Sequence, residues 1–383
     1  MMMEWLRVQW QARRLAVRRR LALLLRGEFD PYPIPPEGLK LSPSEWHHVE
    51  VDAAPLALSW SRADIDDPGE WQRVARDRLR TLVGFSRDND VPVAKHVDDQ
   101  PVADGFQRRR QYLRVAAGSD VPVNLVWQEG AGTEPMPVMI CLQGTNAGAH
   151  LSWGQVLMPA DPIKIDRGAD IALQAARRGY LSVCVEQACF GERREQILPR
   201  RSPTPCIDTA NHAIALGRCL VGERAGDVSA TLDWLLGGEH GLSIDVARVH
   251  VMGSSSGGTT ALYSAALDER ITAVLASSCL GFVRNMMRMR GDSEGQNLVP
   301  GMLLWFELDD IVALCAPRPF VTVSARDDHI WPYDGAATVV ESAKKAYAAL
   351  NALDAIVAVP AEGGHRFYPK IAWPAFEKLV ALQ

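Results

Sequence analysis

Short apolar runs of β type alternate with stretches of helical periodicity from residue 111 onward, and this alternation restricts the fold more than any other feature. Six runs are almost continuously apolar: residues 138–142, 180–185, 249–252, 271–277, 320–323 and 355–359. Strands of this composition occur in parallel sheets that helices cover on both faces. Helices are expected near residues 170–178, 226–236, 257–267, 333–350 and 373–382. The pattern predicts an α/β fold with a mostly parallel central sheet over residues 111–383, opened by an antiparallel pair at 111–116 and 121–128.

Residues 1–110 carry helical signals and are expected to form a mostly helical extension rather than an independent catalytic domain. The proline-rich stretch 30–36 cannot be helical. Residues 67–83 then show an apolar stripe at helical spacing, with Asp67 at an N-cap position ahead of Pro68.

Seven arginines crowd the first 26 residues, where Leu6, Trp10, Val17, Leu21 and Leu24 recur at helical spacing. Such a helix is interpreted first as packing against the body of the protein or against a second subunit of a homo-oligomer. Contact with an anionic membrane surface is the alternative. The apolar run is too short for a secretory signal, and no stretch approaches the length of a membrane span. We therefore expect a cytoplasmic protein.

Composition excludes several classes of protein. The chain of 383 residues is 47% apolar and has a formal net charge of −5, without the basic excess of a nucleic-acid-binding protein. Its seven cysteines are scattered and form no CxxC motif, which indicates buried thiols in a reducing compartment rather than a disulfide framework or a zinc site.

The candidate nucleophile is Ser255, within the motif Gly253-x-Ser255-x-Gly257. The motif follows an apolar strand directly and precedes a helix directly. A nucleophilic serine on a sharp strand-to-helix turn needs small residues two positions away on either side, so that the backbone can double back. Three consecutive serines stand here, and only Ser255 has glycine at both flanking positions. A serine-rich loop without function is the alternative interpretation.

A nucleophilic serine needs a base and an acid, which this kind of fold supplies in the order Ser, Asp or Glu, His. Two histidines follow Ser255, and His365 is the candidate base because it lies in a glycine-containing loop after the last expected strand. The acid should follow the strand at 320–323, where Asp327 and Asp328 are both available. His329 is then a loop residue that lines the site.

The oxyanion hole requires two N–H donors aimed at the charge that develops on the substrate. The backbone N–H of Ser256, directly after the nucleophile, is one candidate. Thr145, in the loop after the strand at 138–142, is the other. A glycine-rich turn without function is the alternative for that loop. Gln143, His329 and Trp331 are the candidate substrate-binding residues around these positions.

Several motifs resemble those of the acetyl xylan esterase and dienelactone hydrolase branch of the α/β-hydrolases, over about residue 71 to the C-terminus. They are LQGT at 142–145, ARRGY at 176–180, FGER at 190–193, MGSSSGG at 252–258, ALDERI at 266–271 and APRP at 316–319. In that branch the acid stands four residues before a proline, a frame that Asp328 and Pro332 match. Gly364-His365 matches its Gly-His loop. The resemblance implies the α/β-hydrolase fold and hydrolysis of carboxylic esters, often small acyl groups on sugar-like alcohols, without a metal or cofactor.

The chain departs from that branch at Gln143-Gly144, where His-Gly is common, and it shows no export signal. Three other functions stay open. The same triad could cleave a carbon–carbon, thioester or peptide bond. The chain could also be a catalytically inactive binding module, or its N-terminal helix could give it a membrane-peripheral or purely structural role.

Two segments are candidates for specificity. Residues 281–313 are rich in methionine and could form a lid or pocket wall, or pack as ordinary helix. Four arginines at 193, 194, 200 and 201 could meet an anionic substrate, although a solvated loop is the first interpretation.

Overall fold

The computed structural model describes residue 17 and residues 36–382, apart from 63–64, 86–91, 104, 132–133, 146–147, 203, 205 and 290–294. The arginine-rich helix expected at the N-terminus therefore lies outside the described residues, except for Val17. The chain divides into two units, Met1–Glu50 and Val51–Gln383, and the second contains the sheet and the candidate site.

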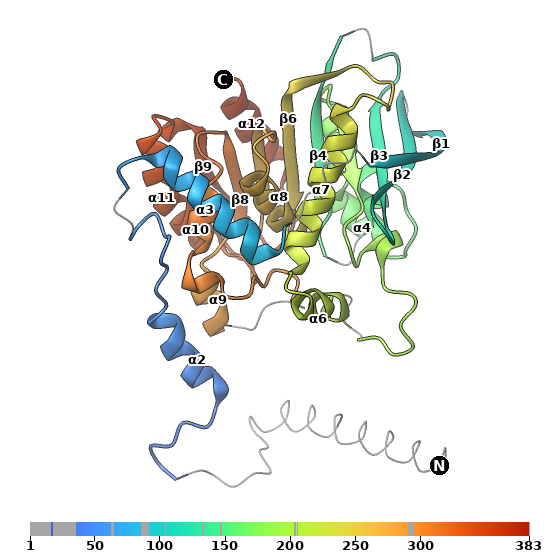
Figure 1. The fold of residues 1–383 in the computed structure, drawn as a ribbon. Helices are drawn as coiled ribbons and strands as arrows, with labels where there is room; N and C mark the ends of the chain where they lie inside the picture. The colour runs from blue at the N-terminus through green and yellow to red at the C-terminus, as the bar shows by residue number, and fades with distance from the viewer. Residues whose placement is uncertain are drawn as a thin grey trace, which may run out of the picture. The chain divides into compact units, whose positions relative to one another are not determined.

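A sheet of nine strands forms the centre of the second unit, counted over the described residues (Figure 1). Its strands are β1 (Val93–Ala103), β2 (Phe106–Ala116), β3 (Ser119–Gln128), β4 (Met136–Leu142), β5 (Leu181–Val185), β6 (Ile244–Ser254), β7 (Ala273–Ser277), β8 (Phe320–Ala325) and β9 (Ile356–Ala361). Their order is β1-β2-β3-β5-β4-β6-β7-β8-β9. The pairs from β5 to β9 are parallel, and β1, β2 and β3 join them antiparallel. The expected mostly parallel sheet is confirmed.

Helices cover both faces of this sheet. The α-helices of the described residues are α2 (Pro43–Asp52), α3 (Pro68–Val83), α4 (Asp161–Lys164), α5 (Ile171–Ala176), α6 (Ile207–Ala215), α7 (Leu220–Leu236), α8 (Ser256–Leu267), α9 (Val283–Met289), α10 (Leu308–Ala313), α11 (Tyr333–Ala349) and α12 (Pro369–Val380). Successive residues of β4 face opposite ways: Ile140 joins the core under α3, α7, α8, α10 and α11, whereas Met139 joins the core under α5 and α12. This double burial explains the continuous apolar runs. None of the described helices is long and apolar enough to span a membrane.

The expectation of a mostly helical segment up to residue 110 is wrong for residues 93–110, which form β1 and the start of β2. Charged and polar side chains interrupt the apolar ones in β1, and all of its side chains are exposed or half-buried, so it shows no apolar run. Pairing with β2 holds it, together with ion pairs such as Arg108 to Asp98 at 2.7 Å. The stripe of α3 also belongs to the main body, because Trp71 and Leu79 are buried in the same core as the sheet.

The topology decides where a site can form. The connection from β4 leads outward to β5 on one side, while β6 pairs with the other side of β4. The loops that follow β4 and β6 therefore diverge above the carboxyl ends of two adjacent parallel strands. A crevice at such a switch point is the usual ligand-binding position in open α/β sheets.

Candidate active site

Ser255 stands alone between β6, which ends at Ser254, and α8, which begins at Ser256. Its backbone has φ 57° and ψ −125°, a conformation that L-residues rarely adopt. Its N–H donates to the carbonyl of Ser277 at 2.8 Å, and its carbonyl accepts from Thr259 N–H in the first turn of α8 at 3.0 Å. Strain of this kind persists only where the surroundings over-determine it.

The flanking glycines are required by close backbone approach. A Cβ at Gly253 would lie 2.2 Å from the carbonyl oxygen of Gly257. A Cβ at Gly257 would lie 2.1 Å from the carbonyl oxygen of Leu142, at the end of β4. The turn can therefore close against the neighbouring strand only when both positions lack a side chain, as the spacing of the motif predicts.

Asp328 and His365 come from the loops after β8 and β9 and are hydrogen-bonded. The Nδ1 of His365 lies 2.8 Å from Asp328 Oδ2 and 3.0 Å from Oδ1. The carboxylate also accepts the backbone N–H groups of Ile330 and Trp331, at 2.9 and 3.0 Å. Burial alone would raise the pKa of Asp328, but the hydrogen bonds from His365, Trp331 and Ile330 outweigh it and hold the pKa below its usual value. Asp328 is thus ionised and oriented toward the imidazole, whereas neighbouring Asp327 is exposed.

Ser255 and His365 line one cavity of about 460 Å³. Within the described part of the chain, no hydrogen bond joins the Ser255 hydroxyl to the imidazole. Such catalytic contacts commonly tighten only when a substrate is bound. The cavity opens over the carboxyl ends of β4 and β6, at the position that the topology favours.

The two candidate oxyanion residues, Thr145 and Ser256, both line this cavity, as do the candidate substrate-binding residues Gln143 and Trp331. The loop after β4 reaches the nucleophile directly, because a Cβ at Gly144 would lie 3.7 Å from the Cβ of Ser255. Ser256 is the first residue of α8, so its N–H is one of the free donors at the helix N-terminus.

A buried network behind the oxyanion residues was not expected from the sequence. Arg224 on α7 is 1% exposed and donates to the hydroxyl of Ser256 at 2.8 Å and to Gln296 Oε1 at 3.2 Å. Gln296, also 1% exposed, accepts from the same hydroxyl at 2.9 Å and donates to Thr145 Oγ1 at 3.1 Å. The network thereby connects the side chains of both oxyanion candidates. The available signal was an arginine that follows an apolar stretch and stands two residues before the helix expected at 226–236.

Arg224 is also unusual in its other partners. Its remaining N–H groups donate to the carbonyl of Ala188 at 2.8 and 3.2 Å and to Cys206 Sγ at 3.4 Å, and the guanidinium lies 4.5 Å from the ring centroid of Phe190. All of these partners are formally neutral. Among the described residues, no carboxylate forms an ion pair with it.

Glu186, directly after β5, supports the loop that carries the oxyanion candidate. It accepts from Gln143 Nε2 at 2.6 Å and from the backbone N–H of Ala149 at 3.1 Å. Burial raises the pKa of Glu186 to about 7, although the Ala149 N–H works in the opposite direction. The candidate Gln143 is therefore held by a buried side chain, and its own exposure is only 3%.

Some expected contributors lie elsewhere. His329 is exposed and packs its ring 6.2 Å from that of His365, but it is not among the residues that line the cavity. In the segment 281–313, Gln296 and Asn297 reach the cavity, whereas Met302 is buried in the main core. All seven cysteines are free and buried, as expected.

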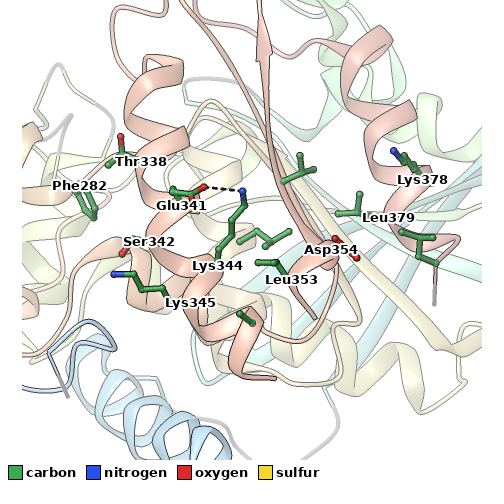
Figure 2. A pocket seen from close by; sticks show the side chains of 14 residues that line it. Phe282, Thr338, Glu341, Ser342, Lys344, Lys345, Leu353, Asp354, Lys378 and Leu379 are labelled. Carbon is green, nitrogen blue, oxygen red and sulfur yellow. Dashed lines mark hydrogen bonds and ion pairs between the residues drawn. The ribbon is translucent and has the colours of Figure 1, made fainter. Parts of the chain in front are cut away.

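Another hollow, of about 1110 Å³, lies away from Ser255 and His365 (Figure 2). It is bordered by α11, the start of β9 and the end of α12, with Lys344 paired to Glu341 at 3.0 Å. It shares no lining residue with the cavity around Ser255. Its lining holds no histidine or cysteine, so it offers no nucleophile–base pair of the kind found beside Ser255.

Comparison with known proteins agrees with this fold. Over 234 residues the chain is 23% identical to the "Putative hydrolase YtaP" of Bacillus subtilis, which covers 60% of this chain and 73% of that protein. Among solved structures it resembles a "putative acetyl xylan esterase" from Bacteroides fragilis, with a TM-score of 0.66, 18% identity and coverage of 89% and 86% of the two chains. A glucuronoyl esterase from Solibacter usitatus matches with a TM-score of 0.62, 16% identity and coverage of 85% and 96%. The model of the Abhydrolase family matches residues 56–331, well over half of the chain. This protein, with its nine-stranded α/β-hydrolase sheet, therefore belongs to the Abhydrolase family.

Proposed function

We propose that this protein is a serine hydrolase that cleaves a carboxylic ester through an acyl-enzyme intermediate. One observation carries the proposal: Ser255, on a strained turn at a helix N-terminus, shares a cavity with a histidine whose Nδ1 is hydrogen-bonded to a buried carboxylate. Nucleophile, base and orienting acid are recognised by this arrangement rather than by sequence position.

In the proposed mechanism, Ser255 Oγ attacks the ester carbonyl while His365 Nε2 takes the hydroxyl proton. The hydrogen bond from Nδ1–H to Asp328 keeps the imidazole in the tautomer whose Nε2 can accept that proton. His365 then returns the proton to the leaving alcohol. Water hydrolyses the acyl-enzyme by the same sequence of proton transfers, and Ser255 is regenerated.

Negative charge on the substrate oxygen would be stabilised by the N–H groups of Ser256 and Thr145. Both residues line the cavity, and each side chain is held by the network of Arg224 and Gln296. A preorganised donor costs no rearrangement at the moment of reaction, which is why losing one typically lowers the rate by about 10²–10³-fold.

An ester is favoured over the other bonds because the similar structures carry esterase names, an acetyl xylan esterase and a glucuronoyl esterase among them. Deacetylation of a small or sugar-like substrate is consistent with a cavity of about 460 Å³. The presence of nucleophile, base and acid in one place argues against an inactive binding module.

The test is hydrolysis of p-nitrophenyl esters of rising acyl length together with labelling by a fluorophosphonate. Ser255→Ala should abolish labelling and lower kcat by about 10⁴-fold or more. Ser254→Ala is the matched control, because it removes the adjacent hydroxyl and should still be labelled. Full activity in Ser255→Ala, with labelling retained, would contradict the proposal.

A further inference from the structure

The charged residues that line the catalytic cavity are all basic. Besides His365, the described lining includes Lys164 at the end of α4, Arg167 in the following turn, and Arg366 next to the candidate base. No aspartate or glutamate of the described chain lines it. Two acids lie near these cations along the chain: Asp166 is exposed and does not line the cavity, and Asp170 lies 3.6 Å from Arg177.

The acidic groups just outside the cavity are held by partners other than these cations. Asp328 is hydrogen-bonded to His365, and Asp161 lies 2.9 Å from His150 Nε2. Glu186 is buried next to Gln143, with a pKa raised to about 7, so it is largely protonated in mildly acidic solution.

Two further sources of positive potential lie behind the nucleophile. The N-terminus of the twelve-residue helix α8 points its free N–H groups at the cavity. The guanidinium of Arg224 is buried 2.8 Å from the hydroxyl of Ser256, and its hydrogen-bond partners among the described residues are formally neutral. Charges screened from water act over longer distances than exposed ones.

A neighbouring hollow of about 770 Å³ differs from the catalytic cavity, because both basic and acidic side chains line it. It shares Lys164 with the catalytic cavity, but its other cations are mostly matched: Arg108 pairs with Asp98 at 2.7 Å, and Arg110 pairs with Glu192. Arg193, considered from the sequence as a contact for an anion, pairs with Asp227. The cations of this hollow thus share its lining with acidic side chains, whereas those of the catalytic cavity do not.

We propose that the natural substrate is an ester that carries a negatively charged group, a carboxylate, sulfate or phosphate, which Lys164, Arg167 and Arg366 bind while Ser255 attacks. The proposal rests on the proposed function and adds the substrate class. The anionic group can belong to the acyl part or to the alcohol part, and the test separates the two.

Two matched substrate pairs make that test. Mono-4-nitrophenyl adipate and its methyl ester differ by one charge on the acyl side, and 4-acetoxyphenylacetate and its methyl ester differ by one charge on the alcohol side. In one pair we expect the anion to have a kcat/KM about tenfold above that of its neutral partner at low ionic strength, as several partly exposed charge contacts together would give. The advantage should shrink at about 0.5 M NaCl, where exposed charges are screened.

Charge-reversal variants assign the effect to the cavity. Lys164→Glu and Arg167→Glu should each lower kcat/KM for the preferred anion several-fold and leave the neutral partner within about twofold. Lys344→Glu is the matched control, because it changes the net charge equally in the separate hollow of Figure 2. It should leave the preference intact.

The outcomes are distinct. If both neutral methyl esters are cleaved as fast as or faster than the anions at low salt, with dependence on Ser255, the substrate class is wrong and the proposed function stands. If the preference persists but responds equally to Lys344→Glu, the assignment to the cavity is overturned. If no ester of either pair is cleaved in a Ser255-dependent way, the proposed function itself fails.

Discussion

Replacing Arg224 with methionine should lower kcat/KM by about 30-fold while the protein stays folded. The substitution keeps an unbranched side chain in a site that is 1% exposed and removes the positive charge next to Ser256. Desolvating an ion costs several kcal/mol, and here no carboxylate of the described residues offsets that cost. Removing the charge is therefore expected to change stability little, since the lost hydrogen bonds to Ala188 are balanced by the lost desolvation cost.

The magnitude follows from the distance between charges. The Nη1 of Arg224 lies 2.8 Å from Ser256 Oγ. Adding about 3 Å across the serine and about 3 Å for an N–H···O⁻ hydrogen bond places the guanidinium roughly 9 Å from the developing oxyanion. Two unit charges at that distance interact by about 2 kcal/mol at an effective dielectric constant near 20. That energy corresponds to about 30-fold in rate.

The assay compares kcat and KM for a neutral ester, p-nitrophenyl acetate, in three variants. Arg224→Met should lower kcat with little change in KM, because the interaction grows only in the transition state. Arg224→Lys retains the charge and should recover most of the activity. Arg76→Met is the matched control: Arg76 is also buried, but it is bound to Ala266 and Glu269 away from the cavity. Equal losses in Arg224→Met and Arg224→Lys, or a loss below about threefold in Arg224→Met, would refute the electrostatic reasoning.

Three further predictions concern the acid, the turn and the buried carboxyl. Asp328→Asn should lower kcat by about 10⁴-fold with KM nearly unchanged, because the amide favours the wrong imidazole tautomer. A decrease in kcat of less than tenfold in steady-state kinetics would exclude Asp328 as the acid. Gly257→Ala should lower the free energy of unfolding in urea by about 3 kcal/mol or more, since its Cβ would lie 2.1 Å from the Leu142 carbonyl oxygen. Gly226→Ala on α7 is the control: its Cβ would meet nothing within 4 Å, so this variant should be more stable by about 0.5–1 kcal/mol. The pKa of Glu186 is about 7 in the folded chain against an ordinary value of 4.5, so its contribution to stability is present below pH 4.5 and is lost as pH rises through 7. The free energy of unfolding of Glu186→Gln should therefore match that of the wild type near pH 4.5 and exceed it by up to about 3 kcal/mol near pH 8. An unchanged difference between the two pH values would contradict this.

The strands that could be predicted are those buried on both faces. The runs at 138–142 and 320–323 lie within β4 and β8, because only apolar side chains can occupy both sides of a covered sheet. β1 could not be predicted in this way. It is an edge strand with mixed polar and apolar side chains, none of them fully buried, and its position depends on hydrogen bonds to β2 rather than on burial.

The sequence by itself determined where a nucleophile could stand, since Gly253 and Gly257 flank Ser255 between a strand and a helix. It also determined the order in which an acid and a base could follow, because loops after successive parallel strands meet at one edge of the sheet. The choice of Asp328 over Asp327 came from the spacing of a related family, and the structure gives the hydrogen bond of Asp328 to His365.

Only the tertiary structure decided what surrounds these residues. Arg224 and Ser256 are 32 positions apart, and Gln296 and Thr145 are 151 apart, so no local pattern connects them. The net charge of −5 likewise gives no indication that Lys164, Arg167 and Arg366 line one cavity. Periodicity records which residues are buried, whereas the charge and hydrogen bonding of a site arise from segments that meet only after the chain has folded.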